Sequence, residues 1–288
     1  MNAITRELII EELEARGYSC YGSDIIKNSV VMPAITILAP AKANPIIYTD
    51  KLIENYDNLN DIVDKIISIY ESHNEFDFDI ISTIRNRNWI LEHIFISLQQ
   101  ESDEPLIKKI CEGPFTGLEQ YLYVRDTTGI EGWSIKLNSS IIAIADISIE
   151  EAWDYARRNT FAPDEPILER LSDLLYEMTG CEDFLDNLFA PPLYVLSNRN
   201  KSKGSIQILN QEYIKKFVLS LEESSGQRPT KLVVLPSSLH EVLLYPVYDG
   251  DIFDVEQEHS LTQMVQIINQ ENVAPEDVLS DHVFILNL

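Results

Sequence analysis

The sequence is poor in basic residues and in long apolar runs, and each shortage argues against a class of protein. Lysine and arginine number 22 against 47 aspartate and glutamate residues, so the formal net charge is -25. Phosphate backbones and anionic lipids repel such a surface, so we expect no direct binding of nucleic acid and no membrane association. No apolar run approaches the roughly 18 residues that a membrane-spanning helix needs. The N-terminal residues lack the pattern of a secretory signal. These features favour a cytoplasmic protein of a bacterium, or of the host cytoplasm if the chain is phage-encoded.

Cysteine is also scarce, and no phosphate-binding loop is present. The three cysteines are far apart and include no CxxC pair: Cys20, Cys111 and Cys181. Reduced thiols are the expected state, without a disulfide or a zinc site. Neither G-x-x-x-x-G-K-[ST] nor G-x-G-x-x-G occurs. His240-Glu241 lacks the second histidine of a zinc-protease helix, because Leu244 stands there. We therefore expect no cofactor and no metal.

The first two thirds of the chain alternate between helical and extended patterns. Apolar residues at helical spacing predict helices over residues 2–16, 59–70, 89–100, 148–158 and 167–178. Within the third of these ranges, residues 94–96 are also compatible with a strand. Runs of β-formers predict strands over residues 29–38, 46–48, 75–81, 118–124 and 133–137. Gly17 ends the first helix, Ser148 opens a capping box, and Pro33 suggests an edge strand or a bulge.

The acidic stretch 182–190 and the following Pro191-Pro192 form the best candidate boundary. Beyond it, a hairpin is predicted from residues 193–197 and 205–209, with Gly204 in its turn. A helix over 211–224 and antiparallel strands over 232–235 and 240–245 follow. A capping box at Ser260 opens another helix, and residues 283–286 form a last strand that needs a central or well-covered position. The prediction is an α+β fold of mostly antiparallel sheets with helices on one face. It has two subdomains: residues 1–190, and a ββαββαβ unit over 191–288.

The C-terminal stretches LVVLPSSLHEVLLYP and ENVAPEDVLSDHVF carry a resemblance to a known family. Together with PLYVLSNRNKSKGSIQIL, they resemble the C-terminal signature of an uncharacterised domain-of-unknown-function family. That family is abundant in gut Firmicutes, often near mobile elements. Weaker similarity extends to PIIYTDKLIENYDNLNDIVDKIISIY and IEEAWDYARRNT, so the resemblance implies a full-length member. It implies no activity.

One compact polar constellation invites a catalytic interpretation: Ser237, Ser238, His240 and Glu241. A hydrolase would use a serine as nucleophile and the histidine as its base. Against this, no G-x-S-x-G elbow is present, and neighbouring strand residues point to opposite faces. The alternative interpretation is that the serines fix a turn and His240 bonds locally.

Two charged groups are further candidates for binding. Arg199, Lys201 and Lys203 cluster and could hold a small anion, or could pair with the acidic surface. The candidate acidic surface for a partner comprises Asp249, Asp251, Asp254, Glu256 and Glu258. The leading hypothesis is a non-enzymatic interaction protein that binds a basic protein partner. In one form of this hypothesis a mobile element or phage encodes the protein, and its acidic surface mimics nucleic acid and so inhibits a nucleic-acid-handling defence machine. The alternatives are a ligand-binding module or hydrolase with its site at residues 236–241, and an oligomeric structural protein.

Overall fold

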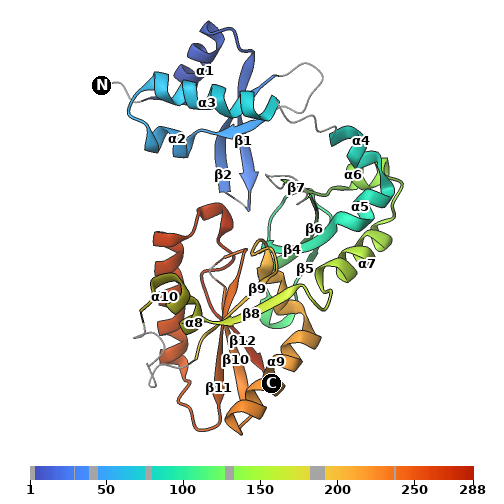
Figure 1. Ribbon diagram of the computed structural model, residues 1–288, viewed down its shortest axis with the longest axis vertical. Helices are drawn as coiled ribbons and strands as arrows, with labels where there is room; N and C mark the ends of the chain where they lie inside the picture. The colour runs from blue at the N-terminus through green and yellow to red at the C-terminus, as the bar shows by residue number, and fades with distance from the viewer. Residues whose placement is uncertain are drawn as a thin grey trace. The chain divides into compact units, whose positions relative to one another are not determined.

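The structure, a computed structural model, describes residues 4–28, 30–38, 45–74, 80–126, 133–181, 192–236 and 238–288. These residues form three antiparallel sheets with helices packed against them, which is the predicted α+β fold (Figure 1). The chain divides into two compact units, residues 1–86 and 87–288. Each unit has a hydrophobic core of its own.

The first unit is a three-stranded sheet, in the order β1-β2-β3, with helices against one face. Its elements are α1 (Arg6–Ala15), β1 (Cys20–Lys27), β2 (Val30–Ile37), β3 (Ile46–Tyr48), α2 (Asp50–Asn55), α3 (Leu59–Asn74) and α4 (Ile80–Arg85). Buried residues from α1, α3 and alternate positions of β2 share one core: Ile9, Leu13, Ile35, Ile37, Ile62 and Ile66. Helical and strand periodicity together direct these side chains toward one another.

Two predictions for this unit need correction. β2, which contains Pro33, has a partner strand on both sides and is not an edge. Proline offers no N–H here, but the Pro33 carbonyl accepts hydrogen bonds from the Thr49 N–H at 3.0 Å and hydroxyl at 3.1 Å. Residues 80 and 81, predicted to end a strand, begin α4. The rest of that predicted strand, residues 75–79, lies outside the described residues.

The second unit contains a four-stranded and a five-stranded sheet. Its elements are α5 (Arg87–His93), β4 (Ile94–Gln100), β5 (Lys108–Ile110), η1 (Gly113–Phe115), β6 (Leu118–Asp126), β7 (Trp133–Lys136), α6 (Ser139–Ile144), α7 (Ile149–Thr160), β8 (Pro166–Arg170), α8 (Leu171–Thr179), β9 (Tyr194–Asn198), η3 (Gly204–Leu209), α9 (Gln211–Ser225), β10 (Pro229–Leu235), β11 (Val242–Tyr248), α10 (Val255–Asn272), η4 (Pro275–Asp277) and β12 (Phe284–Asn287). The four-stranded sheet has the order β4-β6-β5, with β7 also paired to β6. The five-stranded sheet has the order β12-β10-β11-β9-β8.

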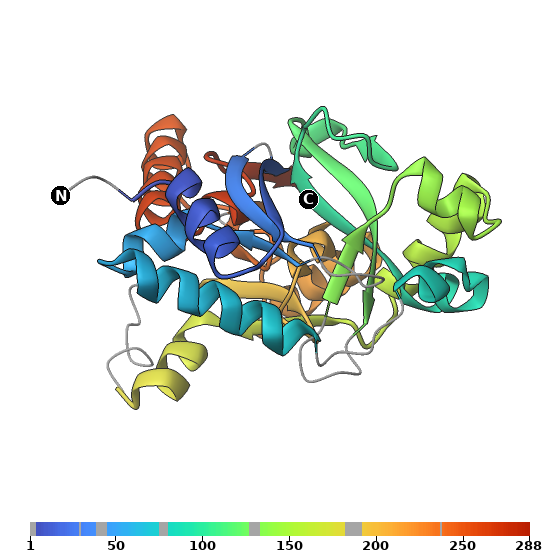
Figure 2. The ribbon, with the colours of Figure 1, turned by 90° about the horizontal axis from the view of Figure 1, so that it is seen from above.

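The four-stranded sheet has two chemically different faces. On one face, the cross-strand pairs Ile94 with Val124 and Ile96 with Leu122 are apolar. Pairs on the other face are polar or aromatic, such as Gln99 with Glu119. Helices α5 and α7 lie side by side against this sheet (Figures 1 and 2). The helix predicted over residues 89–100 therefore ends at His93, and β4 takes the remaining residues because pairing with β6 buries them.

The five-stranded sheet is covered on both faces, which differs from the predicted one-sided arrangement. Val233 and Leu235 pack against α10 through Val265. Val234 is paired across the sheet with Leu244, which is paired with Tyr194, and the Tyr194 ring meets Phe217 of α9. Helices α9 and α10 therefore lie on opposite faces (Figure 1). The apolar run at residues 232–235 reflects this two-sided burial.

The predicted hairpin over residues 193–209 does not form. Its first half is β9, but its second half is the 3-10 helix η3, and β9 pairs with β8 instead. Residues 166–170 are thus a strand, and the helix predicted over 167–178 begins only at Leu171. Because β8 and β9 lie on either side of the predicted boundary at 190, that boundary falls inside the second unit.

Three predictions near the C-terminus also change. Asp254, not Ser260, caps α10, so this helix starts earlier than expected. The strand predicted to end at residue 245 continues through Pro246, which is paired with Leu232. The last strand, β12, is at the edge of its sheet rather than at its centre. Its Phe284 is nevertheless buried, against the ring of Phe115 in η1.

Candidate functional site

The predicted serine and histidine lie in the turn that joins β10 to β11. The Ser238 hydroxyl accepts a hydrogen bond from the His240 backbone N–H at 2.9 Å. This contact closes a short turn and is a common role for serine. His240 and Glu241 precede β11, which begins at Val242, so the predicted strand starts two residues too early. Ser237 lies outside the described residues.

Both ring nitrogens of His240 face groups other than Ser238. The Nδ1 atom accepts from the Lys203 N–H at 3.3 Å, and Nε2 lies 3.6 Å from an Asp277 carboxylate oxygen. A general base must direct a free nitrogen at the nucleophile's proton. The described geometry therefore supports the local, structural interpretation of Ser238 and His240. Glu241 is exposed, and the hydrogen bond between Ser238 and His240 does not involve it.

The loop between β9 and η3 is held tightly against the His240 turn. The His240 carbonyl accepts from the Ser197 hydroxyl at 2.8 Å and from the Gly204 N–H at 3.0 Å. Gly204 has no positive φ, so the reason for glycine is space. A Cβ there would lie 2.5 Å from the Asn198 N and 2.7 Å from the His240 O.

The predicted anion-binding residues in this loop already have partners. Arg199 pairs with Asp164 at 3.1 Å, and Lys201 pairs with Glu169 at 3.4 Å. The Lys203 ammonium lies 5.3 Å from the centre of the Tyr123 ring. The loop thus matches the alternative of pairing with the protein's own acidic and aromatic groups.

The five predicted acidic residues gather where β11 ends and α10 begins. They are Asp249, Asp251, Asp254, Glu256 and Glu258. Two of them have local roles: Asp251 accepts from the Tyr248 N–H at 2.7 Å, and Asp254 accepts from the first N–H groups of α10. Glu256 and Glu258 lie in the first turn of α10, where negative charge is favourable. Ile252 and Val255 protrude among these carboxylates, 73% and 81% exposed.

A buried ionic network lies on the polar face of the four-stranded sheet and was not predicted. Glu119 is 1% exposed and accepts hydrogen bonds from Gln99 at 2.7 Å and Ser102 at 2.8 Å, with the Lys108 ammonium at 3.0 Å. Burial alone would raise the pKa of Glu119, but these hydrogen bonds outweigh it and lower that pKa. The Lys136 ammonium donates to the Gln99 side-chain oxygen at 2.8 Å and to the Glu104 carboxylate at 2.9 Å, which brings a second carboxylate into the network. Fully partnered, the network acts as a cross-link between strands.

The network continues along the same face into an aromatic cluster. Tyr121 is fully buried, and burial raises its pKa well above the ordinary range. Burial likewise raises the pKa of Tyr123 to about 12. The Arg125 guanidinium stacks 3.9 Å from the Phe95 ring centre and lies 3.5 Å from Glu165. The alternation of Glu119, Tyr121 and Tyr123 in the sequence is the signal that could have predicted this face.

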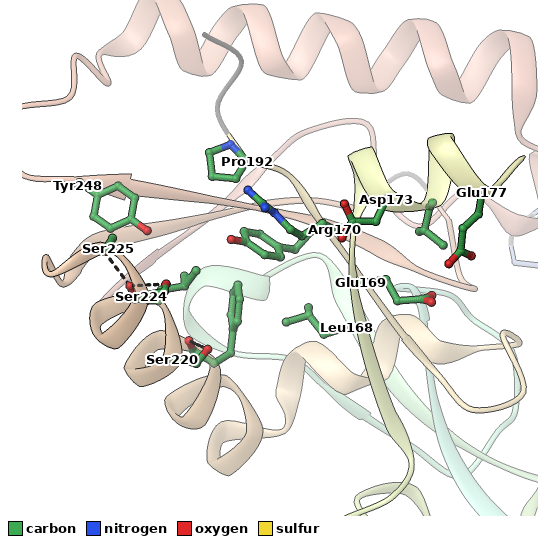
Figure 3. Close-up of a pocket in the computed structure, with 14 residues that line it drawn as sticks. Leu168, Glu169, Arg170, Asp173, Glu177, Pro192, Ser220, Ser224, Ser225 and Tyr248 are labelled. Atoms are coloured by element: carbon green, nitrogen blue, oxygen red, sulfur yellow. Dashed lines mark hydrogen bonds between the residues drawn. The ribbon is translucent and has the colours of Figure 1, made fainter. Parts of the chain in front are cut away.

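A pocket of about 820 Å³ lies between α8 and α9 (Figure 3). Its floor is the α9 face of the five-stranded sheet at the β8 and β9 margin. The lining comprises Leu168, Glu169, Arg170, Asp173, Leu174, Glu177, Pro192, Tyr194, Phe217, Ser220, Leu221, Ser224, Ser225 and Tyr248. Its volume lies within the range of ligand-binding clefts. Sequence analysis missed the pocket because β8 was predicted as helix.

The charged groups of this pocket are mostly acidic. Figure 3 shows Asp173 and Glu177 on α8, across the pocket from the serines of α9. Each of those serine hydroxyls donates to a carbonyl of the chain around α9. Arg170 is the one basic residue of the lining. Burial raises the pKa of Tyr194, so its phenol stays neutral at physiological pH.

Comparison with protein families identifies the family of this chain. The model of DUF5688, a family of unknown function, matches residues 3–287. The chain belongs to the DUF5688 family. No curated protein and no solved structure matches it. Membership in DUF5688 supplies no activity for this chain.

A second hollow of about 730 Å³ lies beside β5 and α7. The Lys109 ammonium lies 4.2 Å from the Trp153 ring centre there. Residues of both charge signs line this hollow, including Arg157 and Asp154, which pair at 3.8 Å.

Across the described residues of this DUF5688 chain, no group of three or more histidine, cysteine or carboxylate side chains is arranged to hold a metal ion. No described helix is both long and apolar enough to cross a bilayer.

Proposed function

We propose that this chain is a non-enzymatic, acidic binding protein that contacts a basic partner protein. The observation that carries the proposal is the imbalance of its charges. Many described basic residues pair with carboxylates of the same chain, among them Arg6, Arg16, Arg87, Lys108, Arg125, Lys136, Arg157, Arg199, Lys201 and Arg228. Each ion pair cancels one charge of each sign, so the formal net charge is -25 whether or not these residues pair. Such a surface attracts cationic partners and speeds their association.

The acidic end of the five-stranded sheet also supports the proposal. Its exposed Ile252 and Val255 stand among carboxylates, and interfaces commonly combine an apolar centre with a charged rim. Gln227, just beyond α9, donates to the Asp249 carbonyl at 2.9 Å and fixes this end of the sheet. A basic partner with apolar residues at its contact surface suits this chemistry.

A finer form of the proposal concerns the partner's identity. The surplus carboxylates could occupy a site built for phosphates, so the partner would be a nucleic-acid-handling machine. A mobile element or phage of Firmicutes that inhibits a defence system would use such mimicry. Duplex DNA should then compete with this chain for the partner.

The test is capture from a Firmicute lysate on the immobilised chain, with elution by increasing salt. The expected result is a basic protein that binds at about 0.15 M salt and elutes as screening increases. Polyglutamate of equal charge is the control competitor, because it carries charge without a folded surface. An eluate without basic proteins, or a capture that salt does not weaken, would refute the proposal. Equal competition by polyglutamate would do so too.

A further inference from the structure

The pocket between α8 and α9 has an apolar floor and an acidic wall. We propose that it docks a basic amphipathic segment of the partner protein, whose apolar side chain enters the pocket while a neighbouring lysine or arginine meets Asp173 and Glu177. This inference rests on the proposed function and specifies the partner's chemistry. It places the contact at a site remote from the predicted Ser238–His240 turn.

The apolar half of the argument comes from α8 and the pocket floor. Helix α8 carries Leu171, Leu174, Leu175, Tyr176 and Met178, yet none of its residues is buried. Met178 is 82% exposed. A helix this apolar normally buries one face. Below it, the Tyr194 and Phe217 rings meet edge to face at 5.0 Å and form a rigid aromatic floor.

The charges of the pocket select a cation rather than an anion. Asp173 and Glu177 are four residues apart on α8 and therefore lie on the same side, where like charges repel. Among the described residues, neither forms a salt bridge, whereas Glu169 already pairs with Lys201 at 3.4 Å. A lysine or arginine placed between them would remove the repulsion.

The opposite wall offers little to an anion. Ser220 donates to the Phe217 carbonyl at 2.7 Å, and Ser224 and Ser225 donate to the Leu221 carbonyl at 3.0 and 2.7 Å. Their hydroxyl protons are therefore committed to the α9 backbone. Arg170 is the one cation of the lining, against the three carboxylates of Glu169, Asp173 and Glu177. The pocket thus complements a segment that is apolar and positively charged.

Fluorescence anisotropy with two labelled peptides tests this assignment on the full chain. One probe is a helix-forming peptide of leucine and lysine, and the other has every leucine replaced by serine at the same charge. The leucine peptide should bind more tightly, by about tenfold, because it adds one buried apolar side chain to the charge attraction. Equal affinity for the two peptides would overturn the docking proposal.

Two pairs of variants locate the binding. Asp173→Asn with Glu177→Gln should weaken the leucine peptide about tenfold, through the loss of two ion pairs. The matched control, Glu101→Gln with Glu112→Gln at exposed positions beside η1, removes the same charge. It should change binding less than about twofold, because η1 packs on β12, at the opposite edge of the five-stranded sheet from β8, and distant charges are screened. Equal losses in both pairs would overturn the pocket but leave the acidic-binding function standing. No binding of either peptide to the unaltered chain would refute both.

A charge-neutral variant tests the cavity itself. Ser220→Trp should fill the pocket and abolish the preference for the leucine peptide, whereas Ser220→Ala should leave it unchanged. Circular dichroism checks that both variants fold. If Ser220→Trp binds the leucine peptide as the unaltered chain does, the proposal is wrong. If light scattering shows a dimer that Ser220→Trp dissociates, a second copy occupies the pocket and the proposal is likewise wrong.

Discussion

Substitution of Gly204 by alanine should destabilise the second unit strongly. The new Cβ would lie 2.4 Å from the Ser197 Oγ, 2.5 Å from the Asn198 N and 2.7 Å from the His240 O. Two of these atoms belong to the backbone and cannot rotate away. Overpacking of this kind costs about 1–3 kcal/mol. Separation of η3 from the His240 turn would also weaken the Gly204 N–H hydrogen bond to the His240 carbonyl, worth about 1 kcal/mol. We expect a loss of about 3 kcal/mol in the free energy of unfolding.

Urea unfolding followed by tryptophan fluorescence measures this loss. All three tryptophans, at positions 89, 133 and 153, belong to the second unit, so the signal reports on that unit. With a denaturant slope of about 3 kcal/mol per molar urea, the midpoint should fall by about 1 M.

A matched control separates crowding from backbone conformation. Gly226 caps α9 with a φ of +74°, and a Cβ there meets nothing within 4 Å. Gly226→Ala should therefore cost only about 1 kcal/mol, from the left-handed conformation. If Gly204→Ala unfolds at the same urea concentration as Gly226→Ala or at a higher one, the packing argument is wrong.

Three further predictions follow from single side chains. Ser148→Ala removes the hydroxyl that accepts from the Glu151 N–H at 3.1 Å at the start of α7, and should lower the free energy of unfolding by about 1 kcal/mol in urea; an unchanged midpoint would contradict the cap. Burial raises the pKa of Tyr123 to about 12, above the pKa of about 10 that tyrosine has in an unfolded chain. The stability that the neutral Tyr123 phenol contributes is therefore complete below about pH 10 and is lost as pH rises toward 12. Tyr123→Phe should accordingly show a shallower fall of stability over that range, and an identical pH profile would refute this. Burial also raises the pKa of Cys111 to about 11, so native protein at pH 8 should be alkylated at Cys20 and Cys181 first, as mass spectrometry would show; early modification of Cys111 would contradict its burial.

Elements whose pattern is local were predictable from the sequence. Helices α1, α3 and α9 repeat their apolar residues at helical spacing, and Ser148 caps α7 as the capping box indicates. The antiparallel pair β10 and β11 also forms as predicted. In each case neighbours along the chain supply the determining contacts.

Elements defined by distant pairing were not predictable. β4 and β8 each adjoin a helix without a break, and their apolar residues fit either structure locally. Pairing with β6 and β9 decides in favour of strands. The same limit applies to His240: its spacing from Ser238 suggested chemistry, but Lys203 and Asp277, far away in the sequence, occupy its ring nitrogens.

The pairing of β12 with β10 leaves one edge of β10 without its partner for part of the time that the chain is being synthesised. Strand β10 is almost wholly buried along residues 232–235, yet one of its two edges is paired only by residues 284–287. During synthesis this edge must wait for about fifty further residues to leave the ribosome before its partner exists. An apolar strand with an open edge is a template for pairing with another nascent chain. Crowded polysomes are therefore the setting in which this fold is most exposed to misassembly.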